Sequence, residues 1–191
     1  MGKRMTKEER RIQLLAMANQ IVQKSGTEAL TLISLADYAG VSKPITYEHF
    51  GSREALLSAL YQSYDQRVIE AIEQAVAEHP VSLEATVDSV VKSYLACVVH
   101  CGSQYEEIIA ALQAYPGYRN LKADIRYYFS KAYWQILQPH LTGSFQENKG
   151  VLYAIHGTID AISDAVMMEG LSYEAAESLL RKLILTVVRS L

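Results

Sequence analysis

The segment of residues 31–61 has the sequence TLISLADYAGVSKPITYEHFGSREALLSALY. Thr31 is a suitable N-cap for a short helix, because its hydroxyl can accept a hydrogen bond from a backbone N–H of the first turn. Gly40 suits a tight turn with a positive φ angle. Ser42 can cap a second short helix with Pro44 in its first turn, where the missing N–H of proline costs nothing. The segment therefore predicts two short helices on either side of a glycine turn.

A longer helix follows the second short one. Ser52 can cap it, and its apolar pattern runs from Arg53 to about Glu78. Two short helices with a longer one behind them form the helix-turn-helix layout. In that layout the second short helix enters the DNA major groove and the first braces it across the backbone. The sequence therefore predicts a DNA-binding head.

The residues expected on the outer face of this head suit contact with DNA. Lys43, Pro44 and Ile45 are candidates for the base side, where Lys43 can reach a base edge and Ile45 a thymine methyl group. Hydroxyl, imidazole and guanidinium donors are candidates for phosphate oxygens. The predicted DNA-binding set is Thr31, Ser42, Lys43, Pro44, Ile45, Tyr47, His49 and Arg53.

These residues also carry a resemblance to a known family. Its pattern has Thr, then Ala-Gly-Val-Ser, then Tyr-x-His-Phe, then Ser-Lys/Arg-Glu-x-Leu-Leu. Residues 31, 39–42, 47–50 and 52–57 match it. Across residues 6–61 the sequence resembles the TetR family of bacterial transcription regulators. The resemblance implies a homodimer that binds pseudo-palindromic operator DNA through two heads, acts as a repressor and is released by a small-molecule effector.

Two positions depart from the family pattern. Pro44 stands where many relatives have Gly, and Thr46 stands where a large aliphatic or aromatic residue is usual. Thr46 should face the small core of the head, so we expect its hydroxyl to bond to the backbone. Ile45 either compensates for this small side chain or contacts a base. These departures leave the operator sequence open.

The rest of the chain is predicted to be helical. Thr6 with Glu9, and Ser144 with Glu147, form two further capping boxes, and Ser172 can cap the last helix. Gly and Pro separate apolar-periodic stretches at 81–100, 105–114, 121–138, 144–169 and 172–191. The predicted fold is all-α with about nine helices. Residues 1–53 form a three-helix helix-turn-helix head, and residues 54–191 form a larger ligand-binding and dimerisation domain.

The charge distribution is consistent with this division. Residues 1–53 carry eight Lys and Arg against five Asp and Glu, whereas residues 54–191 carry ten against sixteen. The head is therefore net positive and the remainder net negative, although the whole chain has a formal charge of −3. Such a molecule would present one end to phosphate.

The larger domain is rich in tyrosine, because eleven of the thirteen tyrosines lie beyond residue 53. An aromatic pocket with a few polar groups is a typical small-molecule site. The residues predicted to line it are Tyr94, His100, Tyr105, Tyr127, Trp134 and Tyr153. The resemblance implies that the last two long helices form the dimer as a four-helix bundle. A helical adaptor that binds DNA and a protein partner, without an effector, is the alternative function.

Two further clusters contain side chains that could bind a metal ion. Cys97, His100 and Cys101 lie within one helical turn, and His156, Asp160 and Asp164 recur at i, i+4 and i+8. We expect buried thiols and a solvated or inter-subunit face rather than metal sites, because each set lies on a single helix. No phosphate loop or nucleophile motif is present in the sequence, so we expect a protein that is not an enzyme and needs no metal or cofactor. The polar N-terminus and the lack of a long apolar run predict a cytoplasmic protein without a membrane partner.

Overall fold

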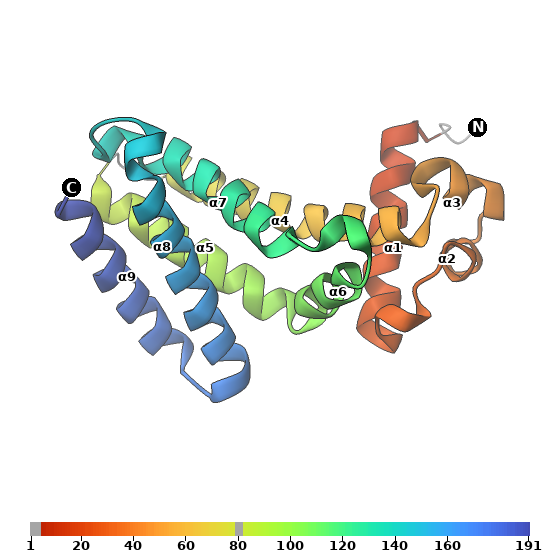
Figure 1. The fold of residues 1–191 in the computed structure, drawn as a ribbon. Coiled ribbons are helices and arrows are strands. Elements are labelled where there is room, and N and C mark those ends of the chain that lie inside the picture. Colours follow the sequence, from red (N-terminus) through yellow and green to blue (C-terminus); the bar gives the residue numbers. More distant parts are fainter. Residues whose placement is uncertain (1–4, 79–81) are drawn as a thin grey trace. The chain divides into compact units, whose positions relative to one another are not determined.

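The computed structural model describes residues 5–78 and 82–191, and every long element in them is an α-helix (Figure 1). In chain order, the helices are α1 (Lys7–Ser25), α2 (Leu32–Ala39), α3 (Lys43–Phe50), α4 (Arg53–Ala77), α5 (Leu83–Cys101), α6 (Gln104–Gln113), α7 (Leu121–Leu137), α8 (Phe145–Asp164) and α9 (Tyr173–Arg189). Short 3-10 turns η1 (Thr27–Ala29), η2 (Pro116–Tyr118) and η3 (Gln138–His140) join some of them. The predicted all-α class and the number of helices are confirmed for the described residues.

Most helices begin where the capping chemistry predicts. The capping boxes of Thr6 and Ser144 are both formed, and the Ser172 hydroxyl accepts a hydrogen bond from the backbone N–H of Ala175 at 3.2 Å. The predicted start of a helix at Val81 lies outside the described residues. There α5 begins at Leu83, after Ser82 as N-cap. Local side-chain chemistry thus sets most of the element boundaries.

The end of α8 differs from the continuous α-helix predicted to residue 169. The segment Ala165–Glu169 is a π-helical turn, in which backbone bonds span five residues and the turn is wider. Gly170 then ends the helix in the left-handed conformation, with φ of 77°. The predicted stop at Gly170 is therefore correct, although the last turn has a different geometry.

The chain divides into two compact units. One comprises residues 1–65 and 103–119, and the other comprises residues 66–102 and 120–191. The first unit therefore contains the predicted head of residues 1–53, the start of α4, and α6. The functional division at residue 53 stays a prediction.

In the first unit, α1 packs on α2, and α2 packs on α3. Its core includes Leu14 and Ala18 of α1, Leu35 of α2, and Leu56 and Leu57 of α4, all fully buried. Burial of a leucine side chain contributes about 1.5–3 kcal/mol, so this core stabilises the unit to which α3 is attached.

In the second unit, α7 packs along α8, and α5 packs along α9. Aliphatic side chains from α5, α8 and α9 meet the aromatic side chains of α7 in its core, among them Val91, Leu95, Tyr133, Ile159 and Leu180. In the described residues, no helix combines the length and apolar character needed to cross a membrane.

Candidate nucleic-acid interface

The turn between α2 and α3 has the geometry that its sequence predicts. The Thr31 hydroxyl accepts a hydrogen bond from the Ser34 N–H at 3.0 Å, and the Ser34 hydroxyl accepts one from the Thr31 N–H at 2.9 Å. Gly40 ends α2 in the left-handed conformation with φ of 63°, which favours glycine. Ser42 occupies the N-cap of α3, but its side chain makes no capping hydrogen bond. Ser42 is therefore the N-cap residue, as predicted, but the predicted hydrogen bond from the helix backbone to its side chain is absent.

Helix α3 is anchored by its inward face. Thr46 and Phe50 are buried, and Thr46 is fully buried. The Thr46 hydroxyl lies 2.9 Å from the carbonyl oxygens of Leu32 and of Lys43, to which it can donate. The expected bond from Thr46 to the backbone is thus present, and it also ties α3 to the start of α2. A buried hydroxyl without such an acceptor would cost about 1–3 kcal/mol.

Helix α1 holds the other end of α3. Arg11 donates a hydrogen bond to the His49 carbonyl oxygen at 2.8 Å, and its guanidinium lies 4.9 Å from the centre of the Phe50 ring. A cation at this position also interacts favourably with the negative end of the α3 dipole. Both ends of α3 are therefore fixed by side chains from within the same unit.

The outward face of α3 is polar and exposed. Lys43, Pro44 and Tyr47 are exposed, and Ile45 is half-buried. Ser42, just before the helix, is also exposed. The predicted base-contacting residues thus lie together at the start of α3, with Tyr47 one turn further on. A short helix with this face free is suited to enter a major groove.

Thr31 and His49 are less open than the α3 face. Thr31 is half-buried and its hydroxyl is engaged with Ser34. His49 is half-buried, and its Nδ1 is buried without a hydrogen-bond partner among the described residues. Burial lowers the pKa of His49, and the charges of Lys7, Arg11 and Arg10 lower it further, whereas Glu48 opposes them. At neutral pH the imidazole is therefore uncharged and carries one N–H donor.

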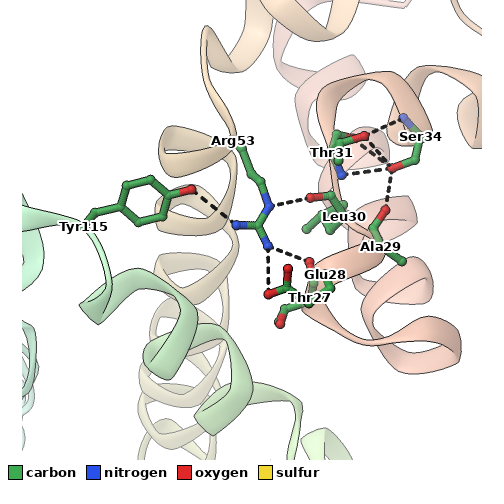
Figure 2. A network of polar contacts seen from close by, with 8 residues as sticks. All are labelled: Thr27, Glu28, Ala29, Leu30, Thr31, Ser34, Arg53 and Tyr115. Atoms are coloured by element: carbon green, nitrogen blue, oxygen red, sulfur yellow. Dashed lines mark hydrogen bonds and ion pairs between the residues drawn. The ribbon is translucent and has the colours of Figure 1, made fainter.

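Arg53 begins α4, where the sequence predicts it, but its side chain makes its contacts within the unit. Figure 2 shows its guanidinium turned to the backbone of η1, where Nε donates to the Leu30 carbonyl at 2.9 Å and Nη2 donates to the Thr27 carbonyl at 2.8 Å. Nη1 lies 3.3 Å from the Tyr115 hydroxyl, and Glu28 lies 3.7 Å from Nη2. This arrangement does not match the predicted phosphate contact, because all three guanidinium nitrogens already have partners within the unit. Its geometry is that of a residue that fixes the start of α4 to η1.

Two charged groups near α3 were missed from the sequence. Lys7, at the start of α1, lies 3.8 Å from the carboxylate of Glu48 on α3, and both side chains are largely exposed. Arg10 lies one turn along α1 and acts on the charge of His49. Their signal in the sequence was the basic run at 3–11, which was counted in the charge balance and not assigned to DNA.

Comparison with known proteins agrees with this geometry. The model of the family described as bacterial regulatory proteins, tetR family, matches residues 14–60, which span the core of the head. The HTH-type transcriptional activator FasR of Mycolicibacterium smegmatis is 37% identical over 75 residues, which are 39% of this chain and 34% of that protein. Residues 14–60 of the chain thus form the DNA-binding head typical of the TetR family. The aligned part thus spans about a third of the length of this curated relative.

Solved structures share the fold of this chain over almost its whole length. A TetR-family transcriptional regulator from Streptomyces coelicolor superposes with a TM-score of 0.71 at 16% identity, covering 97% of this chain and 99% of that one. The multidrug binding protein EbrR complexed with imidazole superposes with a TM-score of 0.67 at 18% identity, covering 94% and 89%. The fold of a helix-turn-helix head with a larger helical domain is therefore confirmed.

The predicted ligand-pocket residues do not form a single cluster. Tyr94 is buried, 5.7 Å from Phe129 between ring centres. Tyr127 and Trp134 instead pack around Phe145, and Tyr127 is 47% exposed. Tyr153 is half-buried, and its ring shares the Lys149 ammonium with Tyr127, at 5.3 and 5.7 Å. Two residues lie elsewhere: His100 is exposed, and Tyr105 belongs to the first unit. Helical spacing located the aromatic residues but not the face on which each one lies.

A different aromatic cluster occupies the interior of the second unit. The His156 ring stacks on Phe129 with 4.9 Å between centres and 10° between planes, and Tyr133 lies 6.2 Å from His156. His156 is 5% exposed, and its Nδ1 has no hydrogen-bond partner among the described residues. Burial, and then the charge of Arg126, lower the pKa of His156 to about 4. The ring is therefore uncharged at neutral pH.

The predicted solvated face of His156, Asp160 and Asp164 is wrong for His156, which is buried, whereas Asp160 and Asp164 are exposed. No group of three or more His, Cys, Asp or Glu side chains in the described ranges is arranged to hold a metal ion. Cys97 and Cys101 are half-buried, and burial raises the pKa of both thiols. A raised pKa keeps a thiol protonated and less nucleophilic.

Proposed function

We propose that this TetR-family protein is a one-component transcription repressor that binds operator DNA as a homodimer and is released by a small molecule. The carrying observation is the exposed outer face of α3. The helix is fixed by the buried Thr46 in its middle and by the Arg11 contacts at its last turn. Lys43, Pro44 and Ile45 contact bases, whereas Thr31, Ser42, Tyr47 and His49 contact phosphate. Arg53 is left out of this set because its guanidinium is bonded within the unit.

The operator contacts are tested by selecting random duplex DNA on the purified protein and titrating salt against the selected sequence. A two-fold-symmetric consensus with a steep salt dependence is the expected result. Tyr47→Phe should weaken binding to all sequences alike, because it removes one hydroxyl donor to phosphate. Tyr38→Phe is the matched control, since Tyr38 is exposed on α2 and its hydroxyl is bonded to Lys24 and Gln20. Weak binding without sequence preference would count against the proposal that the protein binds a specific operator.

The homodimer is proposed to form through α8 and α9. On α9, Leu179 and Leu183 recur at i and i+4 and are each 39% exposed. On α8, small residues at 154, 157 and 161 form an exposed stripe. A Cβ atom at Gly157 would meet no heavy atom within 4 Å in the described residues. An apolar helix face beside a stripe that allows close backbone approach suits a second copy of the same chain.

Gly157 offers a sharp test of this interface. Gly157→Leu should convert the dimer to monomers in sedimentation and abolish tight operator binding, because the branched side chain fills the space needed by the partner helix. Gly157→Ala is the matched control, and it should remain dimeric with a helix stabilised by up to about 1 kcal/mol. If both variants sediment like the wild type, the interface lies elsewhere.

The effector is proposed to be a small aromatic molecule with one polar group, bound inside the second unit. Support comes from the aromatic cluster of Phe129, Tyr133 and His156, together with the unpartnered Nδ1 of His156. The relative EbrR, described as a multidrug binding protein, was solved with imidazole. A panel of small aromatics should raise the melting temperature of the protein, and those that do so should release it from its operator. Stabilisation without release would favour a different role for the site.

One observation favours a second candidate, in which the protein activates transcription. The curated relative that matches the head is named an activator. A reporter gene placed behind the selected operator, with and without the regulator, separates the two. Repression predicts higher expression when the regulator is absent, and activation predicts lower expression.

A further inference from the structure

The outer face of α3 carries a carboxylate among its DNA-facing candidates. The side chain of Glu48 is 67% exposed. It lies one turn after Pro44 and next to Tyr47, both exposed, whereas Thr46 and Phe50 point into the unit. Glu48 is therefore on the side of the helix that the proposed function turns toward the groove.

The contact between Glu48 and Lys7 does not immobilise this carboxylate. Its Oε1 lies 3.8 Å from the Lys7 ammonium, and the Lys7 side chain is 73% exposed. An exposed ion pair of this kind contributes little, about 0–1 kcal/mol. The carboxylate can therefore exchange this contact for a better donor, and the nearby ammonium lowers the repulsion between Glu48 and the DNA phosphates.

The chemistry of a carboxylate limits what it can recognise in DNA. A carboxylate only accepts hydrogen bonds, so it cannot bond to a phosphate oxygen. In the major groove, guanine and thymine present acceptors at their six- and four-position oxygens, which would repel it. Cytosine presents an amino group alone, and adenine presents an amino group beside the acceptor N7. Cytosine is thus the base that a carboxylate prefers.

We propose that Glu48 is a specificity-determining residue that accepts a hydrogen bond from the exocyclic amino group of one cytosine in each operator half-site. The inference rests on the proposed operator binding. Glu48 lies five residues after Lys43, which is about 7.5 Å along a helix. Its cytosine is therefore within about two or three base-pair steps of the base contacted by Lys43, at 3.4 Å per step.

The test compares base preferences among full-length variants by selection of random duplexes, followed by affinity measurements on operators with each base at every position. Glu48→Ala should lose about tenfold discrimination for cytosine at a single position of each half-site. Glu48→Gln should change the preference at that position to adenine, because a carboxamide can donate to N7 while accepting from the amino group. Lys7→Met should weaken binding to all sequences alike and keep the cytosine.

The outcomes separate this inference from the function on which it rests. If the wild-type protein selects no consensus, operator binding itself fails. If it selects one and both Glu48 variants select the same sequence, Glu48 has no role in base recognition. A uniform gain in affinity with unchanged preference would also overturn the inference, since it would mean that Glu48 only repels phosphate. Alanine and glutamine both favour helices, so unchanged circular dichroism and melting temperature verify that α3 remains folded.

Discussion

Replacing Asp65 by Asn should stabilise the protein at pH 8 and have little effect at pH 4. Asp65 lies on α4, is 4% exposed, and accepts a hydrogen bond from the Tyr105 hydroxyl at 2.7 Å. Burial raises its pKa from 3.8 to about 7, and the Tyr105 bond opposes this rise. The charged form is therefore disfavoured in the folded protein.

The direction of the pH dependence follows from proton binding. Between about pH 4 and pH 7 the folded protein keeps a proton on Asp65 that the unfolded chain has already released. Stability must then fall as pH rises through this window. A shift of about three pKa units at about 1.36 kcal/mol each corresponds to about 4 kcal/mol at pH 8. Asparagine removes this cost and keeps an oxygen that accepts the Tyr105 bond.

The assay is urea unfolding followed by circular dichroism from pH 4 to pH 8, at one fixed protomer concentration because a dimer's stability depends on it. The difference between the variant and the wild type should grow with pH and approach 4 kcal/mol as an upper value. Asp37→Asn is the matched control, because the Asp37 side chain is exposed on α2. A difference that is constant across this range would refute the reasoning, since it would place the pKa of Asp65 near its ordinary value.

Three further predictions concern two buried side chains and one half-buried side chain. His156→Phe should stabilise the protein more at pH 5 than at pH 7, by about 2 kcal/mol. The folded protein holds the pKa of His156 at about 4, below its ordinary 6.5, so the wild type loses stability as pH falls from 6.5 to 4. Equal effects of the substitution at both pH values in urea titrations would contradict this. Thr46→Val should lower the free energy of unfolding by about 1 kcal/mol, because it removes the hydroxyl that bonds to the Leu32 carbonyl. Thr46→Ser is the control, since it keeps that bond. A Val variant as stable as the wild type would show that the bond makes no net contribution to stability. Arg53→Lys should lower the free energy of unfolding by about 1.5–3 kcal/mol, because lysine cannot reach both the Thr27 and Leu30 carbonyls. If this variant instead loses operator affinity at unchanged stability, Arg53 contacts a DNA phosphate.

Much of the fold follows from interactions between residues close together in the sequence. Thr6, Thr31, Ser144 and Ser172 were predicted as caps, and each accepts the expected backbone hydrogen bond. The glycine turn after α2 follows equally from local chemistry. Caps, turns and apolar periodicity involve residues within about four positions, so the sequence contains both partners of each interaction.

The candidate interface was predictable to the same extent. The exposed face of α3 was predicted from the helix-turn-helix layout, and the buried position of Thr46 from the family resemblance; both are as predicted. The acceptor of Thr46 on α2 was not predictable, because Leu32 is fourteen residues away and is brought near by packing. The same holds for the Lys7 contact with Glu48, which joins two helices.

What only the tertiary structure decided was the partner of each long side chain. Arg53 was predicted to bind phosphate, yet it bonds to Leu30 and Thr27, which are 23 and 26 residues away. The aromatic side chains of α7 divide between a buried cluster at His156 and a half-exposed one at Phe145. Period and composition determine that a residue lies on a helix and which neighbours share its turn. The residue that faces it across a packed interface depends on how the helices pack, because van der Waals contact and burial act between segments that are distant in the chain.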